Sequence, residues 1–139
     1  MKKLLIILLL LIPLTASALG ISWYPGSIDF GQIKRREQYP FSYYIINSNP
    51  TANCFQSQQF EIIGYKEKPI PEQWITLDPD YFCLEPYTSQ KINGILKIRP
   101  KFGIKPLKGD YRGWVGACLD VNGNLGLCAA TTLKFKIWK

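Results

Sequence analysis

Hydrophobic and polar residues alternate in short runs along the chain from Ile21 onward, and Pro, Gly and Asn separate the runs. A period of two is typical of strands with one buried face, and no 3.6-residue apolar period is long enough to predict a helix. The pattern predicts seven strands, at residues 27–33, 38–47, 60–66, 73–77, 91–99, 110–121 and 125–138. This arrangement favours an all-β fold, a single immunoglobulin-like β-sandwich of about seven strands.

The last two predicted strands form the clearest pair, because Asn122-Gly123-Asn124 between them tolerates the positive φ of a tight hairpin loop. Alternation predicts two inward-facing sets, Tyr111, Gly113, Val115, Ala117, Leu119 and Val121 on the first strand and Leu127, Ala129, Thr131, Leu133, Phe135 and Ile137 on the second. Folding the chain at Gly123 sets Cys118 opposite Cys128 on the same face. A cross-strand disulfide between these two cysteines is therefore predicted.

The first 18 residues have the pattern of a signal peptide. Lys2 and Lys3 form a basic start, an apolar run follows over residues 4–14, and Ala16-Ser17-Ala18 supplies the small residues that signal peptidase recognises. The apolar run is shorter than the roughly 20 residues of a membrane-spanning helix, although an uncleaved N-terminal anchor is the alternative. We expect a signal peptide at 1–18, one β-sandwich domain at 19–139, and an exported protein that is secreted, periplasmic or on the cell surface.

Four cysteines fall in the exported part, an even number that favours disulfides outside the cytoplasm. With Cys118 and Cys128 paired, Cys54 and Cys83 are left to pair with each other. That bond would join the loop after the second predicted strand to the segment before the fifth, and closing a loop of this length contributes about 3 kcal/mol. The sequence has no C-x-x-C pair and no histidine, so no zinc site, other metal or cofactor is expected.

The formal charge is +7, and it falls to +5 without Lys2 and Lys3. Because the chain is expected to leave the cytoplasm, nucleic acid is not an expected partner. The one basic cluster, Lys34-Arg35-Arg36, is typical of a solvated turn between strands. Its functional interpretation is attraction to anionic cell-surface polymers or lipid headgroups. Apart from such headgroups, contact with a membrane is expected only through the signal segment or through a partner.

Several motifs together resemble the PapD-like and major-sperm-protein-like group of exported immunoglobulin-like domains. They are Ile28-Asp29-Phe30-Gly31, Ile45-Ile46-Asn47, Trp74-Ile75-x-Leu77-x-Pro79, Phe82-x-Leu84-x-Pro86, Ser89-x-x-Ile92 and Gly109-Asp110-Tyr111-x-Gly113. The resemblance covers most of residues 27–113. It implies the sandwich fold, and it implies a tyrosine that hydrogen-bonds back across the corner at the start of the sixth strand. The same sandwich carries many functions, and pilus chaperones of the PapD kind have two such domains where this chain has one.

The sequence lacks the residues that common catalytic sites need, so no enzyme is expected. Without histidine, the Ser-His-Asp and Cys-His arrangements are absent. The acidic pair at Asp78 and Asp80 is typical of a proline-containing turn, and Asp110 with Asp120 cannot be placed across a cleft from sequence alone. Asp120-x-Asn122-x-Asn124 resembles the start of a calcium loop, but the later glycine and glutamate of that loop are missing.

The outward-facing side chains of the last two strands predict an interaction surface. Trp114 lies opposite Thr132 in the predicted register, and Lys134, Lys136 and Trp138 share that face. Exposed aromatic side chains mark binding surfaces, although a loop or the first strand could instead cover this face.

These observations favour a noncatalytic exported module with a structural or adhesive role, as a subunit or accessory of a cell-surface assembly. A protein partner or self-association is expected, and the long final strand at 125–139 is compatible with strand exchange. One alternative is a soluble module that binds a carbohydrate or protein of the envelope, and a glycan would then bind on the aromatic surface. The other is a periplasmic chaperone-like protein.

Overall fold

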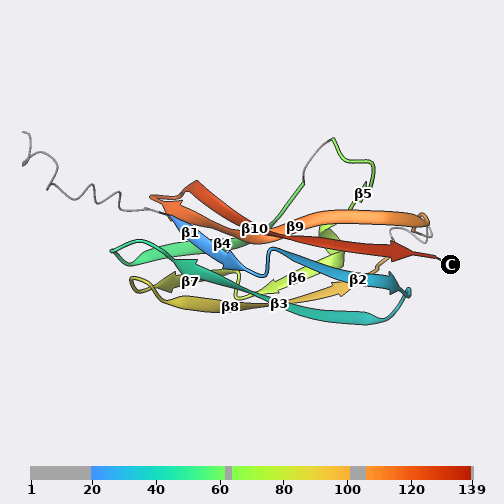
Figure 1. Cartoon of the computed structure of the whole chain (residues 1–139), viewed down its shortest axis with the longest axis horizontal. Helices are drawn as coiled ribbons and strands as arrows, with labels where there is room; N and C mark the ends of the chain where they lie inside the picture. Colours follow the sequence, from blue (N-terminus) through green and yellow to red (C-terminus); the bar gives the residue numbers. More distant parts are fainter. Residues whose placement is uncertain (1–19, 62–63, 101–105, 139) are drawn as a thin grey trace, which may run out of the picture.

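The computed structural model describes residues 20–61, 64–100 and 106–138 and arranges them as two β-sheets packed face to face (Figure 1). The predicted all-β sandwich is confirmed. The strands are β1 (Ile21–Tyr24), β2 (Ser27–Ile33), β3 (Gln38–Asn47), β4 (Asn53–Phe60), β5 (Lys68–Pro69), β6 (Ile75–Asp78), β7 (Tyr81–Leu84), β8 (Ser89–Lys97), β9 (Gly109–Val121) and β10 (Asn124–Ile137). A short 3-10 helix, η1 (Glu72–Trp74), precedes β6.

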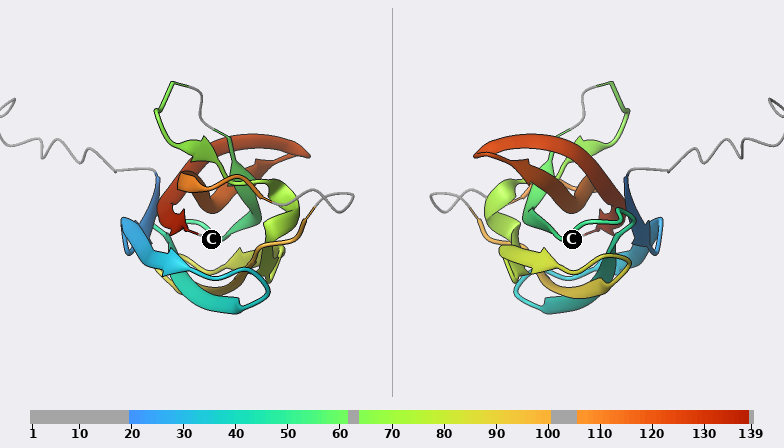
Figure 2. Two further views of the ribbon diagram at one scale, coloured as in Figure 1. Left: turned by 90° about the vertical axis from the view of Figure 1, so that its right-hand side faces the viewer. Right: turned by 90° about the vertical axis from the view of Figure 1, so that its left-hand side faces the viewer.

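One sheet has the strand order β1-β3-β8-β6, and the other has the order β2-β10-β9-β4-β7 with β5 added beside β9. The two sheets curve around the core when the molecule is viewed from either end (Figure 2). Neighbouring strands are antiparallel except for β2, which runs parallel to β10, and β5, which runs parallel to β9. The chain therefore changes sheet between Tyr24 and Ser27, on the side of the sandwich where β10 lies.

The core is built from alternate residues of the facing strands, as the period-two pattern requires. The largest fully buried hydrophobic side chains are Tyr43, Phe55, Ile45, Ile92, Leu96, Leu133, Ile137 and Val115. Tyr43 carries a polar group into this interior, and its hydroxyl donates a hydrogen bond of 3.1 Å to the carbonyl oxygen of Gly116 on the opposite sheet. Burial raises the pKa of the Tyr43 hydroxyl well above its ordinary value of 10.

Tyr111 fills the corner position that the PapD-like resemblance implied. Its hydroxyl donates a 2.8 Å hydrogen bond to the carbonyl oxygen of Leu107, four residues earlier. The ring is buried and stacks on Phe135 with 5.1 Å between the centroids. This bond fixes the path by which the chain enters β9.

The predicted β9–β10 register is confirmed over most of its length. Cys118 pairs with Cys128 and Trp114 pairs with Thr132. The turn itself is tighter than expected: Asn122 and Gly123 have φ values of 52° and 80°, and β10 resumes pairing at once, with Asn124 opposite Val121. A bulge between Leu125 and Cys128 then adds the one residue that restores the predicted register.

Both predicted disulfides are present. Cys118–Cys128 joins β9 to β10, and Cys54–Cys83 joins β4 to β7. The second bond was expected to connect a loop to a segment between strands, but both of its cysteines lie in paired strands and face each other in the register. The sequence missed β4 because polar residues, Gln56 to Gln59, fill half of it, and it missed β7 because that strand has only four residues.

Several predicted strand positions were wrong. The strand expected at 60–66 overlaps β4 only at Phe60, where β4 ends; Tyr65 lies in irregular chain, and residues 62–63 lie outside the described part. The strand expected at 73–77 begins with η1 and becomes extended only at Ile75. The short strands β1, β5 and β7 were not predicted, since two to four residues carry too little alternation to be recognised.

The predicted signal peptide at 1–18 lies outside the described residues. Within the part of the chain that is described, no helix is long and apolar enough to cross a membrane.

Candidate functional site

The outward-facing side chains of β9 and β10 lie on one face, as predicted. In cross-strand order they are Trp114 with Thr132, Arg112 with Lys134, and Asp110 with Lys136, and Trp138 follows the end of β10. The four residues predicted as an interaction surface, Trp114, Trp138, Lys134 and Lys136, therefore share this face. Whether they bind a partner stays a prediction.

At one end of this face, Trp114 is half-buried beneath Tyr65, with 5.1 Å between the ring centroids. Arg112 extends the stack, because its guanidinium carbon lies 4.7 Å from the Tyr65 ring and its Nη2 lies 3.2 Å from Glu67. Tyr65, which lies between β4 and β5, thus covers Trp114, as the alternative interpretation of this face allowed.

At the other end, Trp138 is 54% exposed, and the Lys136 ammonium lies 5.6 Å from its ring centroid. Trp138 is six residues beyond Thr132, the partner of Trp114, which corresponds to about 20 Å of extended chain. The charged side chains between the two rings prevent a continuous aromatic platform.

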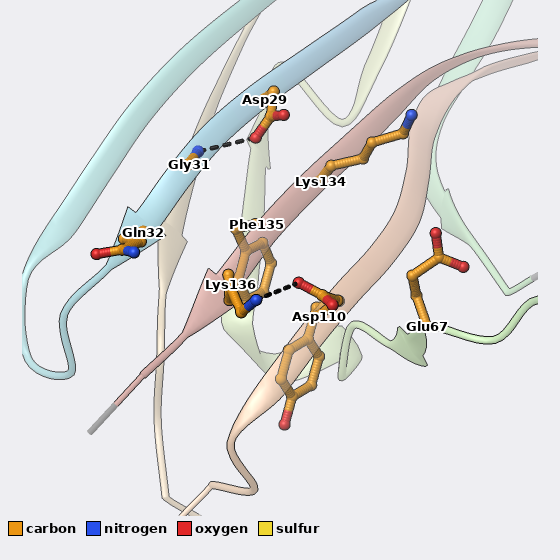
Figure 3. A pocket seen from close by; sticks show the side chains of 9 residues that line it. Asp29, Gly31, Gln32, Glu67, Asp110, Lys134, Phe135 and Lys136 are labelled. Carbon is orange, nitrogen blue, oxygen red and sulfur yellow. Dashed lines mark hydrogen bonds and ion pairs between the residues drawn. The ribbon is translucent and has the colours of Figure 1, made fainter.

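The middle of the face is a shallow groove of about 290 Å³ (Figure 3). Lys136 forms an ion pair of 3.7 Å with Asp110, and Asp29 accepts a hydrogen bond from the backbone of Gly31. Lys134 lies between Asp29 and Glu67 in this view, and its ammonium points away from the Lys136–Asp110 pair. Cations and carboxylates are interspersed here, so the groove does not select a ligand of one charge.

A feature that the sequence only hinted at is the open edge of β10. Strand β2 pairs with β10 only from Thr132 to Ile137, and no described strand pairs with Asn124–Thr131 on the side away from β9. Leu125 and Leu127 on this segment are 50% and 54% exposed. Leu127 was expected to face inward, and it does not reach the packed core.

The open edge borders an apolar pocket. Leu127 lines it together with Gly20, Ile21, Asn49, Phe55 and Leu119, and its volume is about 190 Å³. An unpaired strand edge next to apolar side chains offers backbone hydrogen bonds and hydrophobic contact to the same incoming segment. The sequence signal for this site was the length of the final strand, which exceeds that of its neighbour β2.

Sequence reasoning missed an aromatic pair on the outer face of the other sheet. Tyr24 and Tyr44 face each other across β1 and β3, with exposures of 68% and 39%. Lys91 of β8 lies opposite Tyr44 on the far side. Tyr24 was overlooked because β1 was not predicted as a strand.

The residues considered for metal binding serve the hairpin turn instead. Asp120 accepts a hydrogen bond of 2.9 Å from the backbone of Gly123, and a second of 3.1 Å from the Tyr81 hydroxyl. The bond to Asp120 raises the pKa of Tyr81. Across the described ranges, no group of three or more Cys, Asp or Glu side chains is placed to hold a metal ion.

Comparison with known proteins identifies the fold. No known family matches the sequence, and no curated protein matches it. The structure is similar to a PapD-like domain of human CEP192, with a TM-score of 0.60, 12% identity and 87% of each chain covered. It also matches the Escherichia coli chaperone DraB, with a TM-score of 0.53, 11% identity, and 86% of this chain covered against 54% of DraB.

A suspected carbohydrate-binding protein of Bacteroides ovatus matches with a TM-score of 0.56 and 12% identity, over 85% of this chain and 38% of that protein. The chain thus spans about half the length of the chaperone and less than half of the Bacteroides protein. These likenesses show that the chain has the PapD-like, immunoglobulin-like fold. Its function has to be argued from the candidate sites.

Proposed function

We propose that the protein is a noncatalytic, exported protein-binding module of a cell-surface assembly, and that it binds an extended segment of its partner along the open edge of β10. The observation that carries the proposal is that no described strand pairs with Asn124–Thr131 on the side away from β9, and that Leu125 and Leu127 there are exposed. An added strand would satisfy the outward backbone groups and would cover these leucines.

The hairpin is built to hold this edge in place. The disulfide Cys118–Cys128 ties the open part of β10 to β9, and Gly116 allows the two strands to approach closely at Ala129 and Ala130. A rigid edge loses little conformational entropy when it binds, so more of the interaction energy appears as affinity.

Export is supported by the two disulfides, which form and persist outside the cytoplasm, and by the signal-like residues 1–18 of the sequence. A noncatalytic role is supported by the absence of histidine from the sequence. The chaperone among the similar structures makes a protein partner reasonable for this fold.

The proposal can be tested by removing one outward N–H from the edge. The Thr132 N–H donates to the carbonyl oxygen of Gly26, so it points away from β9. Strand alternation makes the N–H of Ala130 point away from β9 as well, toward the part of the edge that has no partner strand. Ala130→Pro removes this donor while leaving the bonds to β9, because proline is tolerated where the N–H faces away from the sheet. Ala130→Val is the matched control, since it keeps the N–H.

The measurement is the sedimentation of the protein purified from the cells that make it, without heating or reduction. We expect the wild type and Ala130→Val to sediment as a large assembly and Ala130→Pro to sediment as a monomer with an unchanged unfolding midpoint. If Ala130→Pro fails to fold, Leu127→Asp tests the same edge through its exposed side chain. A monomeric wild type, or an assembly that survives both substitutions, would contradict the proposal.

A glycan-binding module is the second candidate, and the Tyr24–Tyr44 pair favours it. Two exposed rings side by side, with Lys91 as a hydrogen-bond donor next to them, form the kind of flat surface on which sugar rings stack. If this candidate is correct, Tyr24→Ala abolishes retention on immobilised envelope glycans, whereas Ala130→Pro leaves retention unchanged.

A further inference from the structure

One end of the sandwich collects most of the basic side chains among the described residues. We call it the basic end and define it by residues 34–37, 97–99, 106–110 and 136–138. It is the end that carries the β2–β3 turn and the end of β10 (Figure 1). Its basic residues are Lys34, Arg35, Arg36, Lys97, Arg99, Lys108 and Lys136.

Several contacts bring these separate segments together. The Arg35 Nη2 donates a 3.0 Å hydrogen bond to the carbonyl oxygen of Pro106, which joins the β2–β3 turn to the segment before β9. Ile137 lies opposite Ile33 on one side and Gly109 on the other. Lys97 pairs with Gln38, directly after the turn. The cluster Lys34-Arg35-Arg36 is therefore one part of a larger surface that the sequence alone does not show.

The charge of the domain is distributed unevenly. The basic end holds seven basic side chains and two acidic ones, Glu37 and Asp110, for a net charge of +5. Among the other described residues there are five basic and eight acidic side chains. Glu37 and Asp110 each lie 3.7 Å from a lysine, Lys34 and Lys136 respectively. An approaching anionic surface would therefore orient the molecule with this end toward it.

Two large apolar side chains are exposed among these cations. Leu107 is 68% exposed and Trp138 is 54% exposed. Tryptophan prefers the boundary between lipid headgroups and acyl chains, and an exposed leucine gains free energy by entering that boundary. Lysine and arginine beside them would meet the phosphate groups of the headgroups.

We propose that the basic end docks the protein on an anionic lipid bilayer. Charge complementarity supports this occupant, and the exposed Leu107 and Trp138 distinguish it from a soluble polyanion. A polymer of phosphate or sulfate gains nothing from Leu107, whereas a bilayer accepts both the cations and the apolar side chains. The open edge of β10 lies at the opposite end of the strand, near Asn124, so a docked molecule would present that edge away from the membrane.

The test is flotation of the protein with vesicles of phosphatidylglycerol and phosphatidylcholine in equal parts. The basic-end variant carries Arg36→Asn, Arg99→Gln and Lys108→Gln, three exposed positions. The control carries Lys66→Gln, Lys91→Gln and Lys134→Gln, which lowers the net charge equally but outside the basic end. All proteins have the same N-terminus, so differences between them report only on the substituted residues.

Each basic residue near an anionic surface contributes about fivefold to the partition coefficient, so we expect the basic-end variant to bind roughly 100-fold more weakly than wild type. The control should change binding by less than about fivefold. Leu107→Ser with Trp138→Ser should also weaken binding, and wild-type tryptophan fluorescence should shift to shorter wavelength on the vesicles.

Three results would overturn the proposal. The control could lose as much binding as the basic-end variant, or pure phosphatidylcholine vesicles could bind as tightly as the anionic ones. The third result has two parts: heparin binds the wild type, and the double variant Leu107→Ser with Trp138→Ser binds vesicles as tightly as the wild type does. Together they would assign the basic end to an anionic polymer.

Discussion

Gly116 is the position where a single methyl group should be most damaging, because a Cβ there would run into the backbone of β10. A Cβ at residue 116 would overlap the carbonyl oxygen of Ala129 and would lie 2.8 Å from the Cα of Ala130. Both obstacles are backbone atoms, so no side-chain rotation can relieve them. The disulfide Cys118–Cys128, two residues away, also prevents the strands from separating freely.

We expect Gly116→Ala to lower the free energy of unfolding by about 3 kcal/mol, the upper part of the range for overpacked interiors. Part of this cost arises because the Gly116 carbonyl oxygen must shift away from the Tyr43 hydroxyl that binds it. For a domain of this size, such a loss corresponds to a fall in Tm of about 12 °C.

Urea unfolding of the oxidised protein measures the effect. Gly26→Ala is the matched control, because a Cβ there meets no atom within 4 Å, and its free energy of unfolding should change by less than about 0.5 kcal/mol. A loss below about 1 kcal/mol for Gly116→Ala would refute the argument that backbone contact at this position constrains the hairpin.

Tyr43→Phe should lower the free energy of unfolding by about 1–2 kcal/mol in urea titrations, because the buried Gly116 carbonyl loses its donor. Burial raises the pKa of Tyr43, so the folded state retains the phenolic proton above pH 10 where the unfolded state releases it. Stability should therefore fall as pH rises above about 10, by up to about 1.4 kcal/mol per pH unit, and Tyr43→Phe should show a shallower decline. An equal decline in both proteins would show that Tyr43 is not the responsible group.

The β9–β10 hairpin shows how much local sequence can predict. Strict alternation, a turn with residues that accept positive φ and two cysteines at matching positions were enough to place Cys118 opposite Cys128. The bulge at Leu125 was not predicted, because an extra residue in one strand has no distinct composition. The polar strand β4 was missed for a related reason: its residues Gln56 to Gln59 line a groove beside β6, so apolar alternation is weak there.

The candidate sites were less accessible to sequence reasoning. Trp114 and Trp138 were correctly placed on one face, but the sequence could not show that Tyr65 covers the first and that charged pairs separate the two. The Tyr24–Tyr44 pair joins residues from β1 and β3, and the basic end joins four separate segments. Such surfaces are absent from any single stretch of the chain.

The amino-acid pattern alone was sufficient to predict an all-β sandwich with two disulfides, no histidine and motifs that resemble those of a PapD-like domain. These features depend on local alternation and residue chemistry, which short-range physics controls. The folded arrangement shows that β2 pairs with β10 only from Thr132 onward and that no other described strand covers that edge of β10. It alone decided that seven cations gather at one end, because strand order and chain reversals set which distant residues become neighbours.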